Sequence, residues 1–287
     1  MNEGLSPKER EQEFFRFCIR EYLKYGSVDE VFKANSYNLP ISYPAFHRLV
    51  KNWGIVKAAG PNQTLDEAIR FMDILAQEKI PLERLYRKLP PSFQTSMSTM
   101  HRILQHVKEG VVRRSGTALV ITKEVDPNMI LVAKDTNRRL RVDDREGNLS
   151  IPMGFSKPGE QMGDSILRVL QREVFASHAV NKTMPAGCHP ADEPFMYLDI
   201  ADVRVQVIHL TLPESIDNFS SFKLTDHAFV PVDEIISNSK SYRCGVSEIA
   251  KGYVTCLQGE TLQEPVFSVS MLNQSLAMGW LQNFDLK

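Results

Sequence analysis

The sequence predicts a multidomain protein: an all-α N-terminal half of tandem helix-turn-helix-like repeats, followed by an α/β sandwich with a mixed sheet. Three observations predict it. A gapless internal repeat fills the first half, and the hydrophobic period changes from helical to strand-like near Ala118. The sign of the net charge also differs between the halves. Residues 1–123 contain 19 Lys and Arg and 13 Asp and Glu, whereas residues 124–287 contain 15 Lys and Arg and 22 Asp and Glu. We therefore expect one repeat in residues 1–60, a second in 61–116, and the sandwich in 117–287.

The composition is that of a soluble globular protein, with 43% hydrophobic and 24% charged residues among 287. No apolar run approaches the roughly 18 residues of a membrane-spanning helix. The N-terminus lacks a signal-peptide core, so we expect a cytoplasmic protein. The cysteines Cys18, Cys188, Cys244 and Cys256 form no CxxC pair, which predicts thiols in a reducing compartment.

The internal repeat aligns residues 27–53 with residues 81–107 at an offset of 54. The matching segments include "FHRLV" (46–50) with "MHRIL" (100–104), and upstream "RF" (16–17) with "RF" (70–71). Self-similarity at a fixed offset indicates a duplicated supersecondary unit. Neither copy carries a signature of a particular family.

Each copy predicts a long helix, a short helix and a second long helix. The expected helices are residues 10–25, from 27, and 42–53 in the first copy, and 65–78, from 81, and 96–109 in the second. Apolar residues at i, i+3, i+4 and i+7 give each last helix a buried stripe: Phe46, Leu49, Val50 and Trp53, then Met100, Ile103, Leu104 and Val107. The order resembles a helix-turn-helix module with a longer connection.

Burying these stripes turns side chains that bond phosphates and base edges outward. The candidate DNA-binding residues are Tyr43, His47, Arg48 and Lys51 in the first copy, Ser98, Thr99, His101, Arg102 and Gln105 in the second, and Arg113 and Arg114 at the tip of a wing. The wing is a strand, turn and strand expected in "VVRRSGTALVIT" (111–122). We expect duplex DNA as a partner; the alternative is a helical module that binds another protein. The recurrence of His-Arg at one helical position favours DNA.

The second half predicts strands that alternate with helices. The expected elements are strands in 118–122 and 128–134, a helix over 162–177, a hairpin of 194–200 with 203–212, a strand entering a helix in 228–235, and a helix over 246–257.

The segment "IPMGFSKPGEQMGDSILRVLQRE" (151–173) carries the most specific motif. It resembles the box of the Nudix family: Gly, five residues, Glu, seven residues, then Arg-Glu-apolar-x-Glu-Glu on a helix. Gly154, Glu160 and Arg168 fit the box, whereas Met153 stands where the family has a glycine. The resemblance spans about residues 117–260. It implies an α/β sandwich, a loop-helix ion pair between Glu160 and Arg168, and carboxylates that gather Mg²⁺ on one helix face.

That face departs from the family. Its three positions hold Val169, Arg172 and Glu173, and Mg²⁺ requires oxygen ligands. We therefore expect no catalytic residue, no bound metal and no other cofactor. Residual hydrolysis stays open through carboxylates from elsewhere, namely Asp143, Asp144, Asp192 or Asp199.

The resemblance leaves a cleft that can still bind a nucleotide or nucleotide-sugar. The candidate ligand-binding residues are Gly154, Glu160, Arg168, Arg172 and Glu173. Arg172 pairs a phosphate in this interpretation; alternatively it bonds only Glu173 or solvent. Arg138, Arg139 and Arg141 lie on a loop that could close over an anion.

We expect a DNA-binding regulator whose degenerate Nudix-like domain is a sensor or a dimerisation module, with a homodimer as one expected assembly. Two alternatives stay open. One is a Nudix pyrophosphohydrolase with a helical targeting domain, and the other is an adaptor that binds only protein.

Overall fold

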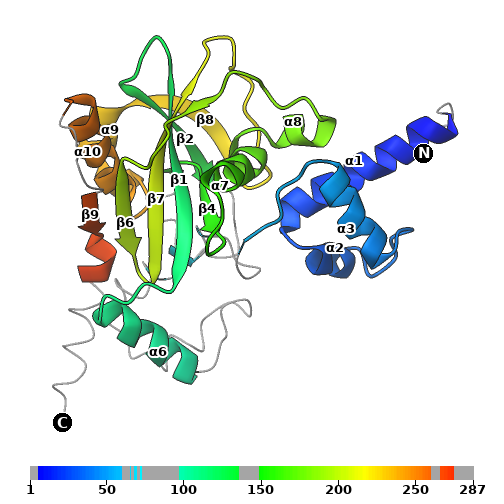
Figure 1. Cartoon of the computed structure of the whole chain (residues 1–287), viewed down its shortest axis with the longest axis horizontal. Helices are drawn as coiled ribbons and strands as arrows, with labels where there is room; N and C mark the ends of the chain where they lie inside the picture. The colour runs from blue at the N-terminus through cyan, green and yellow to red at the C-terminus, as the bar shows by residue number, and fades with distance from the viewer. Residues whose placement is uncertain are drawn as a thin grey trace.

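The computed structural model describes residues 6–59, 65, 68–69, 72, 97–135, 149–259 and 266–274. Three N-terminal helices lie to one side of a β sandwich, and helix α6 lies beneath it (Figure 1). We call residues 6–55 the helical unit. Within the residues described, no helix combines the length and the apolarity needed to cross a lipid bilayer.

The helical unit has helices at the three predicted places: α1 (Pro7–Tyr25), α2 (Val28–Ala34) and α3 (Tyr43–Asn52). A serine begins each one by accepting a backbone N–H of the first turn: Ser6, Ser27 and Ser42. The stripe of α3 is buried as expected, and the core of the unit continues into Ala179 and Val180 of the sandwich. The unit is therefore attached to the sandwich by a shared apolar core.

The second copy is described only in part. Leu65, Ala68, Ile69 and Met72 are helical and buried, in agreement with a helix over 65–78. Helix α6 (Met97–Lys108) matches the expected helix over 96–109. The expected short helix from residue 81 lies outside the described residues.

The sandwich contains two sheets among the described residues. One has the order β4-β1-β7-β6-β9, with β5 also paired to β7: β4 (Met153–Ser156), β1 (Arg114–Lys123), β7 (Val203–Leu212), β6 (Met196–Ile200), β9 (Val266–Val269) and β5 (His189–Pro190). The other is antiparallel, in the order β3 (Leu149–Ser150), β2 (Met129–Asp135) and β8 (Leu224–Pro231). Because β1–β7 and β6–β9 are parallel and the other pairs of the first sheet antiparallel, that sheet is mixed, as predicted.

Helices cover the sheets. They are α7 (Met162–Val169), the π-helical turn η3 (Leu170–Val174), α8 (Ala176–Asn181), α9 (Val232–Ser237), the 3₁₀ turn η4 (Ser239–Ser241) and α10 (Val246–Leu257). The predicted hairpin, the strand entering α9 and the helix α10 are confirmed. The single helix expected over 162–177 is wrong, because Phe175 leaves helical geometry (φ −126°) after the π turn.

The predicted wing is also wrong. Instead of a strand, a turn and a strand, residues 114–123 form the single strand β1, paired with β4 on one side and β7 on the other. Gly116 lies within this strand at a point of close approach, because a Cβ there would come within 2.8 Å of Leu65 Cδ2. Pairing on both sides outweighs the turn tendency of Ser115-Gly116.

Candidate functional site

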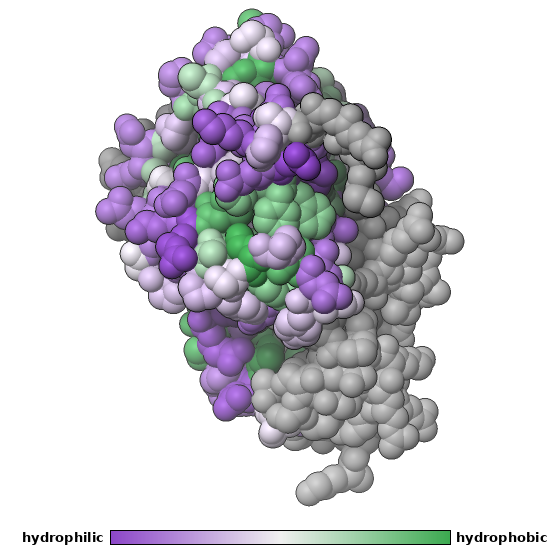
Figure 2. Space-filling view, turned by 90° about the vertical axis from the view of Figure 1, so that its right-hand side faces the viewer, coloured by the Kyte–Doolittle hydropathy of each residue, from purple (hydrophilic) through white to green (hydrophobic). Residues whose placement is uncertain are grey.

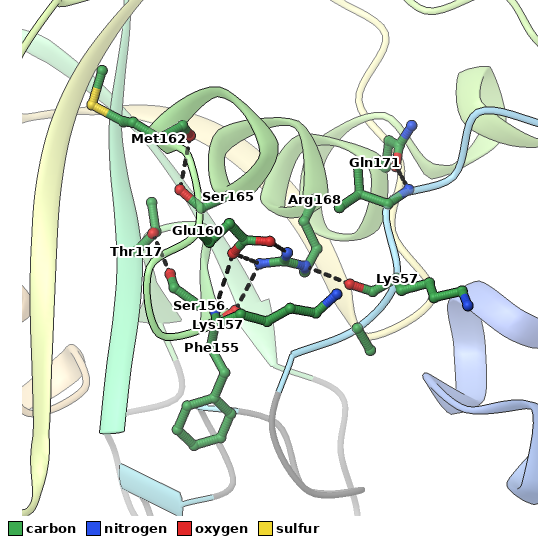
Figure 3. A network of polar contacts seen from close by, with 12 residues as sticks. Lys57, Thr117, Phe155, Ser156, Lys157, Glu160, Met162, Ser165, Arg168 and Gln171 are labelled. Atoms are coloured by element: carbon green, nitrogen blue, oxygen red, sulfur yellow. Dashed lines mark hydrogen bonds and ion pairs between the residues drawn. The ribbon is translucent and has the colours of Figure 1, made fainter. Parts of the chain in front are cut away.

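The loop before α7 is held by the expected ion pair. Arg168 Nη1 donates to Glu160 Oε2 at 2.7 Å and to the carbonyl of Phe155 at 3.1 Å, and Nη2 donates to Glu160 Oε1 (Figure 3). Both side chains are buried. The pair fixes the conformation of the loop from Lys157 to Glu160, which follows β4, whereas Gly154 lies in β4 itself and pairs with Thr117 of β1.

Arg168 also binds the segment that follows the helical unit, residues 56–59. Nε donates to the carbonyl of Lys57 at 2.7 Å. Burial, followed by the charge of Arg172, lowers the pKa of Arg168 to about 10, so the guanidinium stays charged at neutral pH. Because Nε, Nη1 and Nη2 all donate to protein atoms, Arg168 positions the loop and its neighbours.

Gln171 makes a second set of hydrogen bonds from the sandwich to this part of the chain, at Gly54 and Val56, and the sequence did not predict it. The N–H of Val56 donates to Gln171 Oε1 at 2.9 Å, and Gln171 Nε2 donates to the carbonyl of Gly54 at 2.8 Å. Nearby, Trp53 Nε1 donates to the carbonyl of Val180 at 3.1 Å. No local sequence pattern signals bonds between such distant positions.

A cavity of about 250 Å³ lies between these two parts of the protein. The sandwich contributes Met153, Gly154, Phe155, Arg168, Val169, Arg172, Glu173 and Lys223, and the helical unit contributes among others Tyr22, Tyr25, Gly26, Tyr43 and His47. All three positions of the expected metal face therefore line it. So do Tyr43 and His47, which were predicted to bind DNA.

Arg172 faces the C-terminal end of α1. Gly26, the residue that ends this helix, has φ +80°, and a Cβ built on it would lie 2.7 Å from Arg172 Nη2. The C-terminal end of a helix carries partial negative charge, which favours a cation there. Within the described structure, Arg172 Nε is buried and has no hydrogen-bond partner.

The residues on this face do not fit Mg²⁺. Val169 offers hydrocarbon and Arg172 a positive charge, which leaves the buried carboxylate of Glu173 as the face's single anionic group. Magnesium prefers an octahedron of oxygen ligands. In the part of the chain that is described, no cluster of three or more His, Cys, Asp and Glu could hold a metal ion.

The other carboxylates proposed as metal ligands are elsewhere. Asp192 is exposed, and Asp199 binds Arg204 Nε at 2.8 Å on the β6–β7 hairpin. Neither is among the described residues that line the cavity. Asp143 and Asp144 lie outside the described residues, as do Arg138, Arg139 and Arg141.

The predicted DNA-binding residues of the two copies lie apart, because α3 and α6 are on separate sides of the sandwich (Figure 1). His47, Arg48 and Lys51 are exposed on α3, whereas Tyr43 is half-buried and stacks on Phe32 at 4.5 Å between ring centroids. On α6 the exposed residues are Ser98, His101, Arg102 and Gln105. The side chain of Thr99 lies outside the described residues.

Arg113 and Arg114 are not at the tip of a wing, because both bind the fully buried Asp202. Arg113 Nη2 donates to Asp202 Oδ2 at 2.9 Å, and Arg114 Nη2 donates to Oδ1 at 2.6 Å. Burial alone would raise the pKa of Asp202, but hydrogen bonds and charge from the two arginines lower it below its usual value. The pair therefore fastens the start of β1 to the β6–β7 turn.

No family model matches the chain, and no curated protein matches its sequence. Solved structures are similar to parts of it. An Ap4A hydrolase from C. elegans is 14% identical, with 50% of this chain and 98% of that chain covered and a TM-score of 0.38. An ADP-ribose pyrophosphatase from Streptococcus suis is 15% identical, with coverages of 54% and 98% and a TM-score of 0.35. A Nudix hydrolase from Nitrosomonas europaea is 15% identical, with coverages of 55% and 77% and a TM-score of 0.36.

Proposed function

We propose that this chain is a ligand-responsive regulator: the sandwich is a degenerate Nudix-like domain that binds a phosphorylated nucleotide or sugar without metal, and the two N-terminal repeats (residues 1–60 and 61–116) bind duplex DNA through α3 and α6. The observation that carries this proposal is the position of Arg172 in the cavity. A guanidinium can neutralise a phosphate directly through paired hydrogen bonds, so the cavity does not need a metal ion to bind an anion.

The other walls of the cavity support the same class of ligand. Tyr22, Tyr25 and Tyr43 supply aromatic surface for a base or sugar ring. The volume of about 250 Å³ is slightly below the roughly 300–1,000 Å³ of small-molecule pockets. The cavity therefore favours a ligand with one ring and few phosphates over a dinucleoside polyphosphate.

Thermal-shift measurements with nucleotides and nucleotide-sugars in EDTA test the ligand. We expect stabilisation that Arg172→Gln abolishes, whereas Arg204→Gln retains it because Arg204 binds Asp199 away from the cavity. A well-folded sample that no such compound stabilises would leave the sandwich as a structural or dimerisation module.

An assay with Mg²⁺ or Mn²⁺ tests the enzymatic alternative. We expect no turnover of ADP-ribose, dinucleoside polyphosphates or nucleoside triphosphates above background, because Val169 and Arg172 occupy two of the three ligand positions. Turnover that Glu173→Gln abolishes would identify a Nudix pyrophosphohydrolase with a helical targeting domain.

The DNA-binding part of the proposal is supported by the exposed His47, Arg48 and Lys51 on α3 and by the positive charge of residues 1–123. Because such contacts are mostly to phosphate, affinity should fall steeply as salt rises. Mobility-shift titrations of Arg48→Ala on α3 and Arg102→Ala on α6 measure how much each helix contributes to DNA affinity. Binding unchanged in the double variant would contradict a role for either helix and favour the adaptor alternative.

Coupling between ligand and DNA follows from the shared cavity. Tyr43 and His47 line it and also belong to α3, so a bound ligand contacts the helix proposed to read DNA. A ligand changes DNA affinity only if it favours one arrangement of α3 over another. DNA titration with and without a stabilising compound measures this coupling. We also propose that the protein forms a homodimer and is located in the cytoplasm.

A further inference from the structure

An apolar groove of about 810 Å³ crosses the outer face of the helical unit, between α1 and α3. Apolar side chains on this face are surrounded by hydrophilic ones (Figure 2). Its apolar lining includes Phe14, Phe15, Ile41, Leu49 and Trp53. Leu49 is buried and the other four are half-buried, so the groove presents three aromatic rings to solvent.

The internal repeat supplies a comparison for this face. The offset of 54 residues places Phe14, Phe15, Leu49 and Trp53 on Ala68, Ile69, Ile103 and Val107. Those four residues lie in, or pack against, the apolar core that includes β1, β4 and β7 of the sandwich. Leu65, on the same segment, comes close enough to β1 that a Cβ on Gly116 would lie 2.8 Å from it. In the second copy, the equivalent face is covered by apolar residues of this chain.

The rim of the groove is positively charged. Arg16, Arg48 and Lys182 line it and are exposed, against the single acidic residue Glu11 in the lining. Lys182 Nζ lies 4.1 Å from the centroid of the Trp53 ring, and Trp53 is itself held by Val180. The cations are thus arranged beside a fixed aromatic surface.

We propose that this groove binds an amphipathic helix of a partner protein, with apolar residues at i, i+3, i+4 and i+7 and with Asp and Glu along its flanks. An apolar helix face suits a groove between two helices, and its acidic flanks complement the three cations of the rim. The proposal needs neither the ligand nor DNA, so it stands independently of the proposed function. Arg48 contributes to the rim, and a bound helix would therefore cover one candidate DNA contact.

A displayed library of helices of about four turns tests this proposal. Every member has the same apolar stripe, and its flanking positions are either Glu or Lys. Selection on the full chain should enrich Glu at the flanks. The chain has two tryptophans, so with Trp280→Phe a synthesised winner should shift Trp53 fluorescence to the blue, and its Lys-flanked version should bind about tenfold more weakly or worse.

Charge reversal supplies the decisive control. Arg16→Glu with Lys182→Glu should switch the enriched flank from Glu to Lys, whereas Lys24→Glu, which reverses an exposed cation of α1 outside the groove lining, should leave the selected flank unchanged. Thermal melting confirms that each variant is folded. Equal enrichment of both flanks, or no enriched helix, overturns the proposal. Loss of duplex DNA binding in the charge-reversed variant without helix selection by the wild type would identify a DNA surface instead.

Discussion

The guanidinium of Arg172 lies against the backbone of Gly26, so that a methyl group on Gly26 would come within 2.7 Å of Nη2. Gly26 is the residue that ends α1, with φ +80°, and it also lines the cavity. Gly54 has a similar φ of +76° but nothing within 4 Å of the same methyl position. The two glycines therefore differ in contact while sharing a conformation.

Alanine at either glycine should lower the free energy of unfolding by about 1–2 kcal/mol, because L residues are strained in the left-handed region. Gly26→Ala should cost more than Gly54→Ala, since the Arg172 guanidinium must also move. In an Arg172→Ala background this excess should vanish for Gly26 and leave the cost at Gly54 unchanged. Urea unfolding of the single and double variants measures it. An excess that persists without Arg172 would show that the contact is not its cause.

Breaking the ion pair between Arg168 and Glu160 should lower the free energy of unfolding by about 3–5 kcal/mol, because the remaining charge stays buried without its partner. Glu160→Gln and Arg168→Leu are the two single variants, and the double variant should lose less than their sum. The control is Arg204→Leu, whose pair with Asp199 is more exposed (39% and 17% of the side chains) and should contribute about 0–1 kcal/mol. Equal losses at the two pairs would contradict this assignment.

Gln171→Leu should loosen the attachment of the helical unit, since it leaves the N–H of Val56 and the carbonyl of Gly54 without partners. Both hydrogen bonds are partly buried, and each contributes about 0.5–1.5 kcal/mol. Gln171→Glu should be intermediate, because Glu still accepts from Val56 but cannot donate to Gly54. Amide hydrogen exchange at Val56 measures the effect, with fastest exchange expected in the Leu variant. Identical exchange in both variants would rule out this role for the side chain.

Asp202 should make the protein sensitive to acid. Its folded pKa lies below the ordinary value because Arg114 and Arg113 stabilise the ionised form. The stabilisation is therefore complete above the unfolded pKa of about 3.9 and is lost as pH falls through the lower folded pKa. Asp202→Asn should be less stable than wild type near neutral pH, with a smaller difference in acid. Urea midpoints across this range measure it, and a difference independent of pH would contradict the linkage.

Contacts between residues close in the chain could be predicted from the sequence. The ion pair between Glu160 and Arg168, eight positions apart, was expected from the motif that residues 151–173 resemble, because the motif fixes the loop and helix between them. The helices α1 to α3 and the β6–β7 hairpin likewise depend on local periodicity and on capping or turn residues.

Contacts across long separations could not be predicted. Gln171 bonds to residues 115 and 117 positions away, and Arg114 meets Asp202 across 88 positions. The prediction of a wing was wrong for this reason. Ser115-Gly116 has the local character of a turn, but pairing with the distant strands β4 and β7 makes this segment a strand. The short strand β9 was missed because its pairing with β6 joins segments some 70 residues apart.

The parallel pairing of β1 with β7 affects synthesis of the chain. All ten residues of β1 pair with residues 203–212, so the strand lacks this partner until about 90 further residues have been translated. At about 5–20 residues per second, a nascent chain presents Leu119, Val120 and Ile121 without their final neighbours for roughly 5–20 s. The helical unit, whose contacts are mostly local, can fold during that interval. Strand β1 is therefore an apolar segment of the nascent chain that we expect a chaperone to protect until residues 203–212 have been made.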